Sequence, residues 1–150
     1  MKNKVIYLIG SLKNDKIQSL ANKIENELKW AEVFTDWFMP GPEADDFLLS
    51  RSKMRGRSYG QILNSYAAQH IFDFDFHHIN RSDIGIMYMP AGKSCCLELG
   101  YMTGLGKPTF ILFDGEPKDR IDVMFIFAKL NGGDICFSFE ELINKLKKYE

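Results

Sequence analysis

The chain has 150 residues, the length of one domain rather than two. Its 19 basic and 20 acidic side chains leave a net charge of −1, whereas binders of nucleic acids or membrane surfaces carry a basic excess, so we expect neither partner. Three cysteines, two of them adjacent, predict no disulfide framework and favour a reducing compartment. No apolar run approaches the roughly 20 residues that span a bilayer. We therefore expect a cytoplasmic protein with a single domain over residues 1–150.

Apolar runs that fit buried strands alternate with segments of helical spacing. The first run, residues 5–9, ends at a Gly-Ser pair, and residues 15–29 then repeat apolar groups every three or four positions. In chain order, the expected strands are residues 5–9, 31–35, 83–89, 109–113 and 135–137. The expected helices are residues 15–29, 59–79, 94–105, 119–130 and 139–149. Proline and glycine at residues 40–42 predict a break in the chain.

Strands that alternate with helices predict a parallel sheet covered on both faces. For five strands we expect an α/β three-layer sandwich of the flavodoxin-like type, with the strand order 2-1-3-4-5. Ligands bind such sheets beyond the carboxyl ends of the strands, where the strand order reverses. That point lies between the strands at residues 5–9 and 83–89. The loops at residues 10–14 and 90–94 are therefore the candidate site.

The turn after the first strand carries Gly10, Ser11 and Lys13. Gly10 permits a tight turn, and the Ser11 hydroxyl, the Lys13 ammonium and the free backbone N–H groups could hold an oxygen of a phosphate or a sugar. The same residues also form ordinary strand-to-helix turns with a solvated lysine, and for an isolated turn this is the commoner meaning. The turn alone leaves both interpretations open.

The helix expected over residues 94–105 begins at the carboxyl end of the third strand. We expect Ser94 to cap it and Glu98 to lie in its first turn, where the helix dipole keeps the carboxylate ionised. Such a carboxylate is a usable nucleophile; the alternative is a surface glutamate that only complements the dipole. Asp75 could point at the same cleft, while Asp83 is expected to bond locally. A pair such as Asp75 and Glu98 suits glycosyl transfer, with one nucleophile and one proton donor.

These features resemble the nucleoside 2-deoxyribosyltransferase family and the related nucleotide N-glycosidases. The resemblance covers residues 5–124 and is carried by Tyr7 before the Gly-Ser turn and by the spacing of Asp75 and Asp83. Its strongest block contains the ELGY motif, which includes Glu98 and is followed by GKP. The resemblance implies an enzyme that cleaves the N-glycosidic bond of nucleosides and transfers the sugar to another base.

The resemblance also implies roles for individual residues. Glu98 would attack the anomeric carbon and hold the sugar covalently, Tyr7 would orient Glu98 through a hydrogen bond, and Asp75 would contact the base and help to protonate it. Asp122 and Met124 lie in a segment that, in the transferases, reaches into a neighbouring subunit's pocket, so a homo-oligomer is implied. We expect no metal and no cofactor, because protonation activates the leaving base.

The sequence departs from the transferase pattern at Gly92, where the transferases carry an aspartate. Lys93 and Ser94 could instead contact a phosphate, and the turn with Ser11 and Lys13 is similar to the phosphate-binding turn of the nucleotide hydrolases. A nucleoside 5′-monophosphate N-glycosidase, in which water accepts the sugar, is therefore an alternative. A non-catalytic nucleotide-binding module on the same fold is an alternative of another class.

Two further segments allow more than one interpretation. The basic cluster at residues 51–57 is expected to form a solvated loop, or else a lid that contacts phosphate. Phe72, Phe74 and Phe76 alternate in a way that is unusual for a helix. We interpret these three rings as part of the core and the wall of a pocket.

Overall fold

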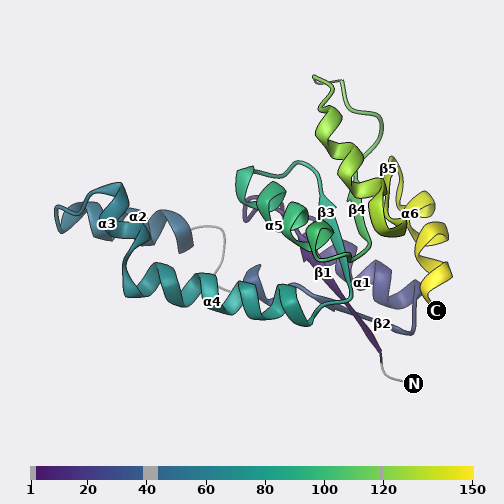
Figure 1. Ribbon diagram of the computed structural model, residues 1–150, viewed down its shortest axis with the longest axis horizontal. Helices are drawn as coiled ribbons and strands as arrows, with labels where there is room; N and C mark the ends of the chain where they lie inside the picture. Colours follow the sequence, from purple (N-terminus) through teal and green to yellow (C-terminus); the bar gives the residue numbers. More distant parts are fainter. Residues whose placement is uncertain (1–2, 39–43, 119) are drawn as a thin grey trace.

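The strands form one parallel sheet in a computed structural model that describes residues 3–38, 44–118 and 120–150. The sheet has five strands in the order β2-β1-β3-β4-β5 (Figure 1). They are β1 (Lys4–Ile9), β2 (Ala31–Phe34), β3 (Ile84–Tyr88), β4 (Thr109–Leu112) and β5 (Asp134–Cys136). The order confirms the predicted flavodoxin-like sheet, with its reversal point between β1 and β3. The predicted break at residues 40–42 lies outside the described residues.

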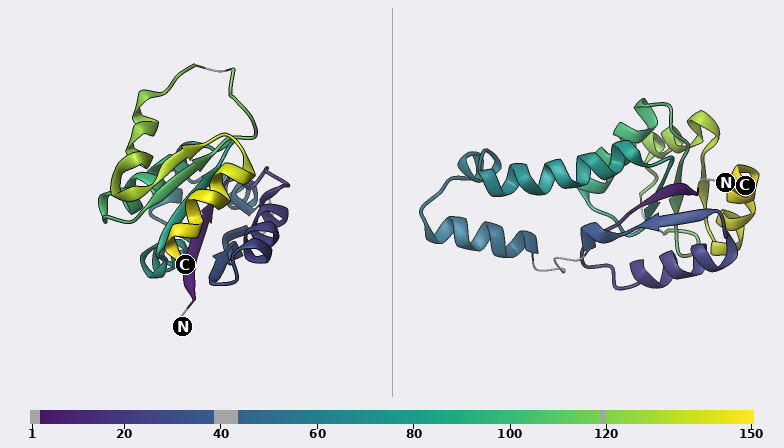
Figure 2. Two further views of the ribbon diagram at one scale, coloured as in Figure 1. Left: turned by 90° about the vertical axis from the view of Figure 1, so that its right-hand side faces the viewer. Right: turned by 90° about the horizontal axis from the view of Figure 1, so that it is seen from below.

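Helices cover both faces of the sheet and make it the middle of three layers (Figure 1, Figure 2). The α-helices are α1 (Ile17–Glu27), α2 (Ala44–Met54), α3 (Tyr59–Leu63), α4 (Tyr66–Arg81), α5 (Lys93–Gly104) and α6 (Phe139–Leu146). The 3-10 helices are η1 (Asp36–Phe38), η2 (Val123–Gly132) and η3 (Lys147–Tyr149). The helix expected over residues 119–130 is thus the shorter η2, which begins after Asp122.

Alternation along β1 decides which helices its side chains meet. Ile6 and Leu8 are buried with the apolar faces of α1 and α6. Val5, Tyr7 and Ile9 are buried on the opposite face, with residues of α4, α5 and η2. Because successive side chains of a strand point to opposite faces, Tyr7 is committed to the α4–α5 side.

Asp83 joins the amino ends of the two central strands. Its Oδ2 accepts a hydrogen bond from the backbone N–H of Val5 at 2.8 Å, and its own N–H donates to the Val5 carbonyl at 2.8 Å. This structural role agrees with the expectation that Asp83 bonds locally. The carboxyl ends of β1 and β3 lie together at the opposite edge, since Ile9 is in register with Met87.

Residues 44–81 form a helical arm, with α2 and α3 at the far end of α4, away from the sheet (Figure 2). The single helix expected over residues 59–79 is divided in two because Ser65 caps α4, accepting a hydrogen bond from the Ala68 N–H at 3.2 Å. Of the basic cluster at residues 51–57, expected to be a solvated loop or a lid, Arg51 and Lys53 lie in the last turn of α2, and Arg55 and Arg57 follow the helix.

The aromatic run of α4 does not form core. Phe72, Phe74 and Phe76 are 56, 44 and 39% exposed, so their interpretation as core is wrong. All three lie within one helix, where every second residue points about 200° away from the one before. Neither the sheet nor α5 can therefore bury rings on both sides of the helix. Among the described residues, no helix has the length and apolar content needed to cross a lipid bilayer.

Candidate active site

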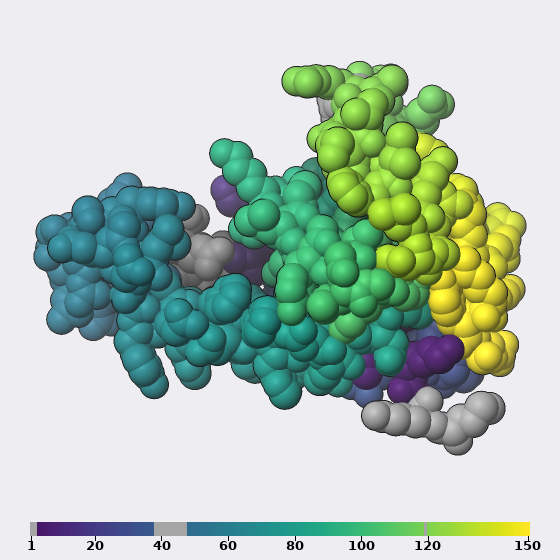
Figure 3. Space-filling view, viewed as in Figure 1, coloured from purple at the N-terminus to yellow at the C-terminus, as the bar shows by residue number. Residues whose placement is uncertain are grey.

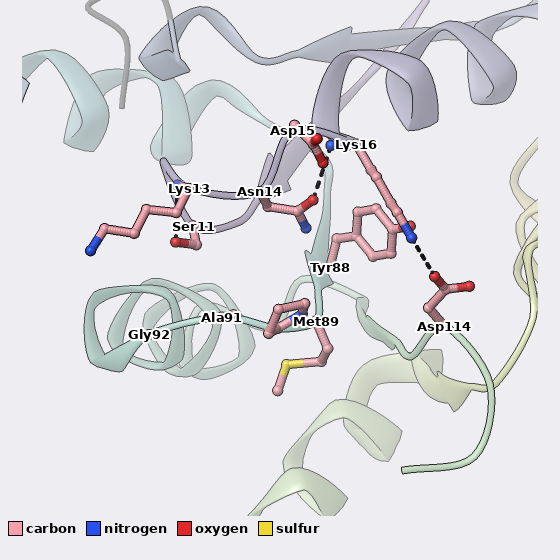
Figure 4. A pocket seen from close by; sticks show the side chains of 11 residues that line it. Ser11, Lys13, Asn14, Asp15, Lys16, Tyr88, Met89, Ala91, Gly92 and Asp114 are labelled. Carbon is pink, nitrogen blue, oxygen red and sulfur yellow. Dashed lines mark hydrogen bonds and ion pairs between the residues drawn. The ribbon is translucent and has the colours of Figure 1, made fainter. Parts of the chain in front are cut away.

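A pocket of about 500 Å³ lies beyond the carboxyl ends of the central strands (Figure 4). The loops after β1 and β3 form most of its wall, as the position of the strand-order reversal predicts. Its lining residues are Ser11, Lys13, Asn14, Asp15, Lys16, Tyr88, Met89, Pro90, Ala91, Gly92 and Asp114. Of the residues singled out from the sequence, this pocket therefore brings together Ser11, Lys13 and Gly92.

Eight lining residues were not singled out from the sequence, among them Asn14, Lys16, Tyr88 and Asp114. Lys16 Nζ and Asp114 Oδ2 form an ion pair at 2.8 Å. Asn14 Oδ1 accepts a hydrogen bond from the Lys16 N–H at 3.0 Å, just before α1. Asp114 had a usable signal, because it follows a predicted strand directly and therefore lies at the same edge of the sheet. Asn14 lies within the candidate loop at residues 10–14, but its burial had no signal in the sequence, since it depends on the neighbouring loops.

Gly10 has a packing role at the start of this loop. A Cβ at this position would collide with the side chain of Ile17 on α1. The next residue, Ser11, accepts a hydrogen bond from the Lys13 N–H at 3.2 Å through its hydroxyl oxygen. The turn therefore holds the start of α1 against β1 and leaves the Lys13 ammonium exposed beside the pocket.

A second group of polar side chains lies on the α4–α5 face of the sheet. Tyr7 is buried in β1, while Glu98 on α5 and Asp75 on α4 are half-buried. Burial first, and then the charges of Glu98 and Asp75, raise the pKa of Tyr7 well above its usual value. β1, α4 and α5 thus carry three ionisable side chains within range of one another's charge. None of the three lines the strand-end pocket.

The N-cap of α5 lies two residues before the predicted one, and this changes the chemistry of Glu98. The N-cap is Gly92, which provides no side-chain hydrogen bond, and Ser94 is the second residue of the helix rather than its cap. Glu98 consequently lies in the second turn. The electrostatic effect of a helix end falls off within the first turn. The expectation that the helix dipole keeps Glu98 ionised is therefore wrong.

Burial dominates the ionisation of Glu98 instead. Removal from solvent, reinforced by the negative charge of Asp75, raises the pKa of Glu98 to about 7. At neutral pH Glu98 is thus a mixture of its protonated and its carboxylate forms. The hydrogen bond expected from Tyr7 to Glu98 does not occur among the described residues, although the buried phenol stays protonated and able to donate.

The remaining predicted residues lie around this face. Lys93 and Ser94 are exposed in the first turn of α5. Asp122 caps η2, its Oδ1 accepting a hydrogen bond from the Met124 N–H at 3.0 Å, and it is near enough to Cys96 for its charge to raise the pKa of that thiol, after burial. Within the described residues, no group of three or more His, Cys, Asp or Glu is placed to hold a metal ion.

Comparison with known proteins identifies the fold. No protein-family model matches the chain, and no curated protein sequence matches it. Among solved structures, it is similar to a 2-deoxyribosyltransferase from the psychrotolerant bacterium Bacillus psychrosaccharolyticus, with 19% identity, a TM-score of 0.59, and coverage of 93% of this chain and 90% of that one. It is also similar to the CMP N-glycosidase BcmB of Clostridium botulinum, with 15% identity, a TM-score of 0.56, and coverage of 96% and 99%.

These similarities place the chain in the class of proteins with a flavodoxin-like α/β fold, to which both of these enzymes belong. The two enzymes carry the names of the two activities that the sequence resemblance indicates. At 15 and 19% identity the likeness establishes the fold, and a fold supports many functions. The chemistry of this chain therefore has to be argued from its own side chains.

Proposed function

We propose that this protein cleaves the N-glycosidic bond of a nucleoside or nucleotide and transfers the sugar to another base. The proposal is carried by Tyr7, Asp75 and Glu98, which come from three separate elements on one face of the sheet and influence one another's ionisation. Two neighbouring carboxyl groups, one with a pKa near neutrality, are the usual equipment for glycosyl transfer.

In the proposed reaction, a carboxylate oxygen of Glu98 bonds to C1′ of the sugar as the C1′–N bond breaks. The electron pair of that bond leaves with the base, and a proton that Asp75 takes up from solvent and passes on neutralises it. In the second step, a nitrogen of the incoming base bonds to C1′ as the bond from C1′ to Glu98 breaks. The proton of that nitrogen passes through Asp75 to solvent, and Glu98 leaves as a carboxylate. The cationic character of the sugar in both steps is stabilised by the two carboxyl groups.

The shifted pKa values support these roles. A pKa of about 7 leaves a substantial carboxylate fraction of Glu98 at neutral pH, while its partial burial keeps the carboxylate poorly solvated and reactive. Tyr7 has a strongly raised pKa, so its phenol stays neutral beside Glu98 and can donate a hydrogen bond without adding a competing negative charge.

The second candidate is a nucleoside 5′-monophosphate N-glycosidase, in which water takes the place of the incoming base. The strand-end pocket favours a phosphorylated substrate, because Ser11, Lys13 and the uncapped start of α5 at Gly92 line it. Backbone N–H groups at a helix start together with a lysine suit a phosphate. Lys93 and Ser94, in the first turn of the same helix, are proposed to contribute to this contact.

We further propose that the chain works as a homo-oligomer. Asp122 and Met124 are on η2, beside α5, and Met124 is largely exposed. In an oligomer, these residues of one subunit would complete the pocket of its neighbour, as the resemblance implies. The exposed apolar side chains around them support an interface on this face.

A base-exchange assay tests the activity. The protein is incubated with a nucleoside or a nucleotide and a second free base, over a panel of bases, and the products are separated by chromatography. A swapped-base product supports the transferase, and a free sugar or sugar phosphate supports the hydrolase. Tight nucleotide binding without any turnover would contradict both and favour a non-catalytic binding module.

Glu98→Gln tests the nucleophile, because the amide keeps the shape of the side chain but cannot form the ester. We expect turnover to fall by on the order of 10³-fold or more, as for the loss of other covalent nucleophiles. Peptide mass spectrometry of the wild-type protein quenched during turnover should find the sugar on the peptide that contains Glu98. Glu27→Gln, an exposed change on α1, is the matched control. Full activity of Glu98→Gln would exclude the mechanism.

A further inference from the structure

The strand-end pocket is larger than a phosphate contact requires. Its volume of about 500 Å³ is in the range of sites that hold whole small molecules, and its lining continues from the start of α5 past Tyr88 to Asp114 beyond β4 (Figure 4). A phosphate at Gly92 and Ser11 would occupy one end only. The lining of the other end indicates what else is bound there.

The charges of the two ends differ. At the end formed by Ser11, Lys13 and Gly92, the Lys13 ammonium has no ion pair among the described residues, and the helix start adds N–H groups. At the other end, the Lys16 ammonium and the Asp114 carboxylate neutralise each other at 2.8 Å. A second phosphate there would face a carboxylate and an already paired lysine. The far end therefore favours an uncharged group.

Asn14 marks the far end as a hydrogen-bonding site. The residue is only 8% exposed, and its side chain points into the pocket (Figure 4). The hydrogen bond from the Lys16 N–H fixes Oδ1 as the acceptor, so Nδ2 is the atom left without a partner among the described residues. An unpaired buried donor lowers stability, and a ligand oxygen that accepted a hydrogen bond from it would recover that loss. Because Nδ2 is closed to solvent, the side chains over it must shift as that oxygen enters.

We propose that this pocket binds a phosphate ester, with the phosphate at the start of α5 and an uncharged, hydroxyl-bearing group against Tyr88 and Asn14. The identity of the substrate rests on the proposed function. If the pocket serves that reaction, the substrate is a nucleotide whose 5′-phosphate carries a further sugar-like group. Gly92 connects the two regions, since it lies six residues before Glu98 and hence about 9 Å along the helix axis from it.

Calorimetric binding to the full chain tests the pocket independently of catalysis. The probes are inorganic phosphate, pyrophosphate and glucose 1-phosphate, which joins one phosphate to an uncharged ring of hydroxyl groups. We expect glucose 1-phosphate to bind about tenfold or more tightly than phosphate, from two or more added hydrogen bonds, and pyrophosphate to gain no comparable affinity. Equal binding of phosphate and glucose 1-phosphate, or tightest binding of pyrophosphate, would overturn the proposal.

Variants of Asn14 test the far end of the pocket. Asn14→Ala removes the donor, and Asn14→Asp retains the acceptor for the Lys16 N–H while replacing the donor with an acceptor. Each should weaken glucose 1-phosphate by about fivefold relative to phosphate, the value of one hydrogen bond. Asn22→Ala, an exposed change on α1, is the matched control. Unchanged selectivity in both Asn14 variants would contradict the assignment.

A spectroscopic measurement on the wild-type chain tests the contact of Asn14 with the ligand without a substitution. In a ¹H–¹⁵N spectrum, the side-chain amide of Asn14 should shift on addition of glucose 1-phosphate but not of phosphate, and a silent amide would overturn the contact. The link to the substrate is tested separately, by comparing the KM of a nucleoside 5′-monophosphate with that of its glycosyl phosphodiester. Glucose 1-phosphate binding without nucleotide cleavage would reject the proposed function while retaining the pocket.

Discussion

At the scale of single residues, the position of Glu98 along α5 sets its chemistry. A glutamate in the first turn would be held ionised by the helix start, whereas in the second turn burial and the charge of Asp75 control it. The first turn of α5 contains no acidic residue. The site therefore contains a carboxyl group that gains and loses its proton near neutral pH.

This ionisation predicts a pH profile for the proposed reaction. The pKa of Glu98 is raised to about 7, so the carboxylate fraction grows as the pH increases through 7, and kcat/KM should rise with it if the carboxylate is the nucleophile. Asp75→Asn removes a negative charge that contributes to the shift. The midpoint of the profile should then move to lower pH, although burial will keep it above the ordinary value for glutamate.

The measurement is kcat/KM from pH 5 to 9 for the wild-type protein and Asp75→Asn, with the midpoint read separately from the rate. A rate that falls as the pH passes 7 would mean that Glu98 serves as the acid, so that the roles of the two carboxyl groups would have to be exchanged. The pH profile therefore tests whether Glu98 is the nucleophile and Asp75 the group that helps to protonate the base, without relying on loss of activity alone.

At the scale of secondary-structure elements, Lys107 ties the end of α4 to the turn before β4. Its ammonium donates to the carbonyls of Ile79, Asn80 and Ser82 at 2.9, 2.7 and 2.6 Å. The last carbonyls of a helix lack their usual partners within it, so a lysine that binds those of Ile79 and Asn80, and that of the C-cap residue Ser82, fixes the helix end. The GKP segment, noted for its resemblance to a family motif, thus anchors the helix that carries Asp75.

Lys107→Met should lower the free energy of unfolding by about 1–3 kcal/mol, because partly buried carbonyl groups lose a charged donor. The measurement is urea unfolding followed by circular dichroism. Lys118→Met, which replaces an exposed lysine after β4, is the control and should remain within about 0.5 kcal/mol of wild type. A Lys107→Met variant as stable as this control would show that the three hydrogen bonds contribute little.

At the scale of the whole molecule, the layer of α4, α5 and η2 carries apolar side chains that a soluble monomer would leave in water. Leu97 on α5 is 76% exposed, and Val123 on η2 is 65% exposed. α4, α5 and η2 lie on the side that faces the viewer in Figure 3. Exposed apolar surface of this kind usually marks an interface.

We therefore expect light scattering coupled to size-exclusion chromatography to give a multiple of the 17.3 kDa chain mass. The double change Leu97→Lys and Val123→Lys places two like charges on this face and should shift the protein toward the mass of one chain. Circular dichroism establishes that the variant is folded. A wild-type protein that stays at the mass of one chain at high concentration would contradict the proposed oligomer.

The sequence by itself determined the sheet and the position of the strand-end pocket. Apolar runs bounded by turns and separated by helical segments are local features, and the carboxyl ends of parallel strands must share one edge. Ser11, Lys13 and Gly92 could therefore be assigned to one pocket before any contact was known. The same reasoning could not decide what the individual groups do within the site.

Tertiary structure alone decided which polar groups meet and in which protonation state. Tyr7 and Tyr88 both belong to central strands but face opposite sides of the sheet. Tyr7 lies on the side of α5, which carries Glu98, whereas Tyr88 lines the pocket with Asn14. The pKa of Glu98 and the unpaired donor of Asn14 both follow from burial. Burial sums contributions from atoms far apart in the chain, so no local pattern of residues records it.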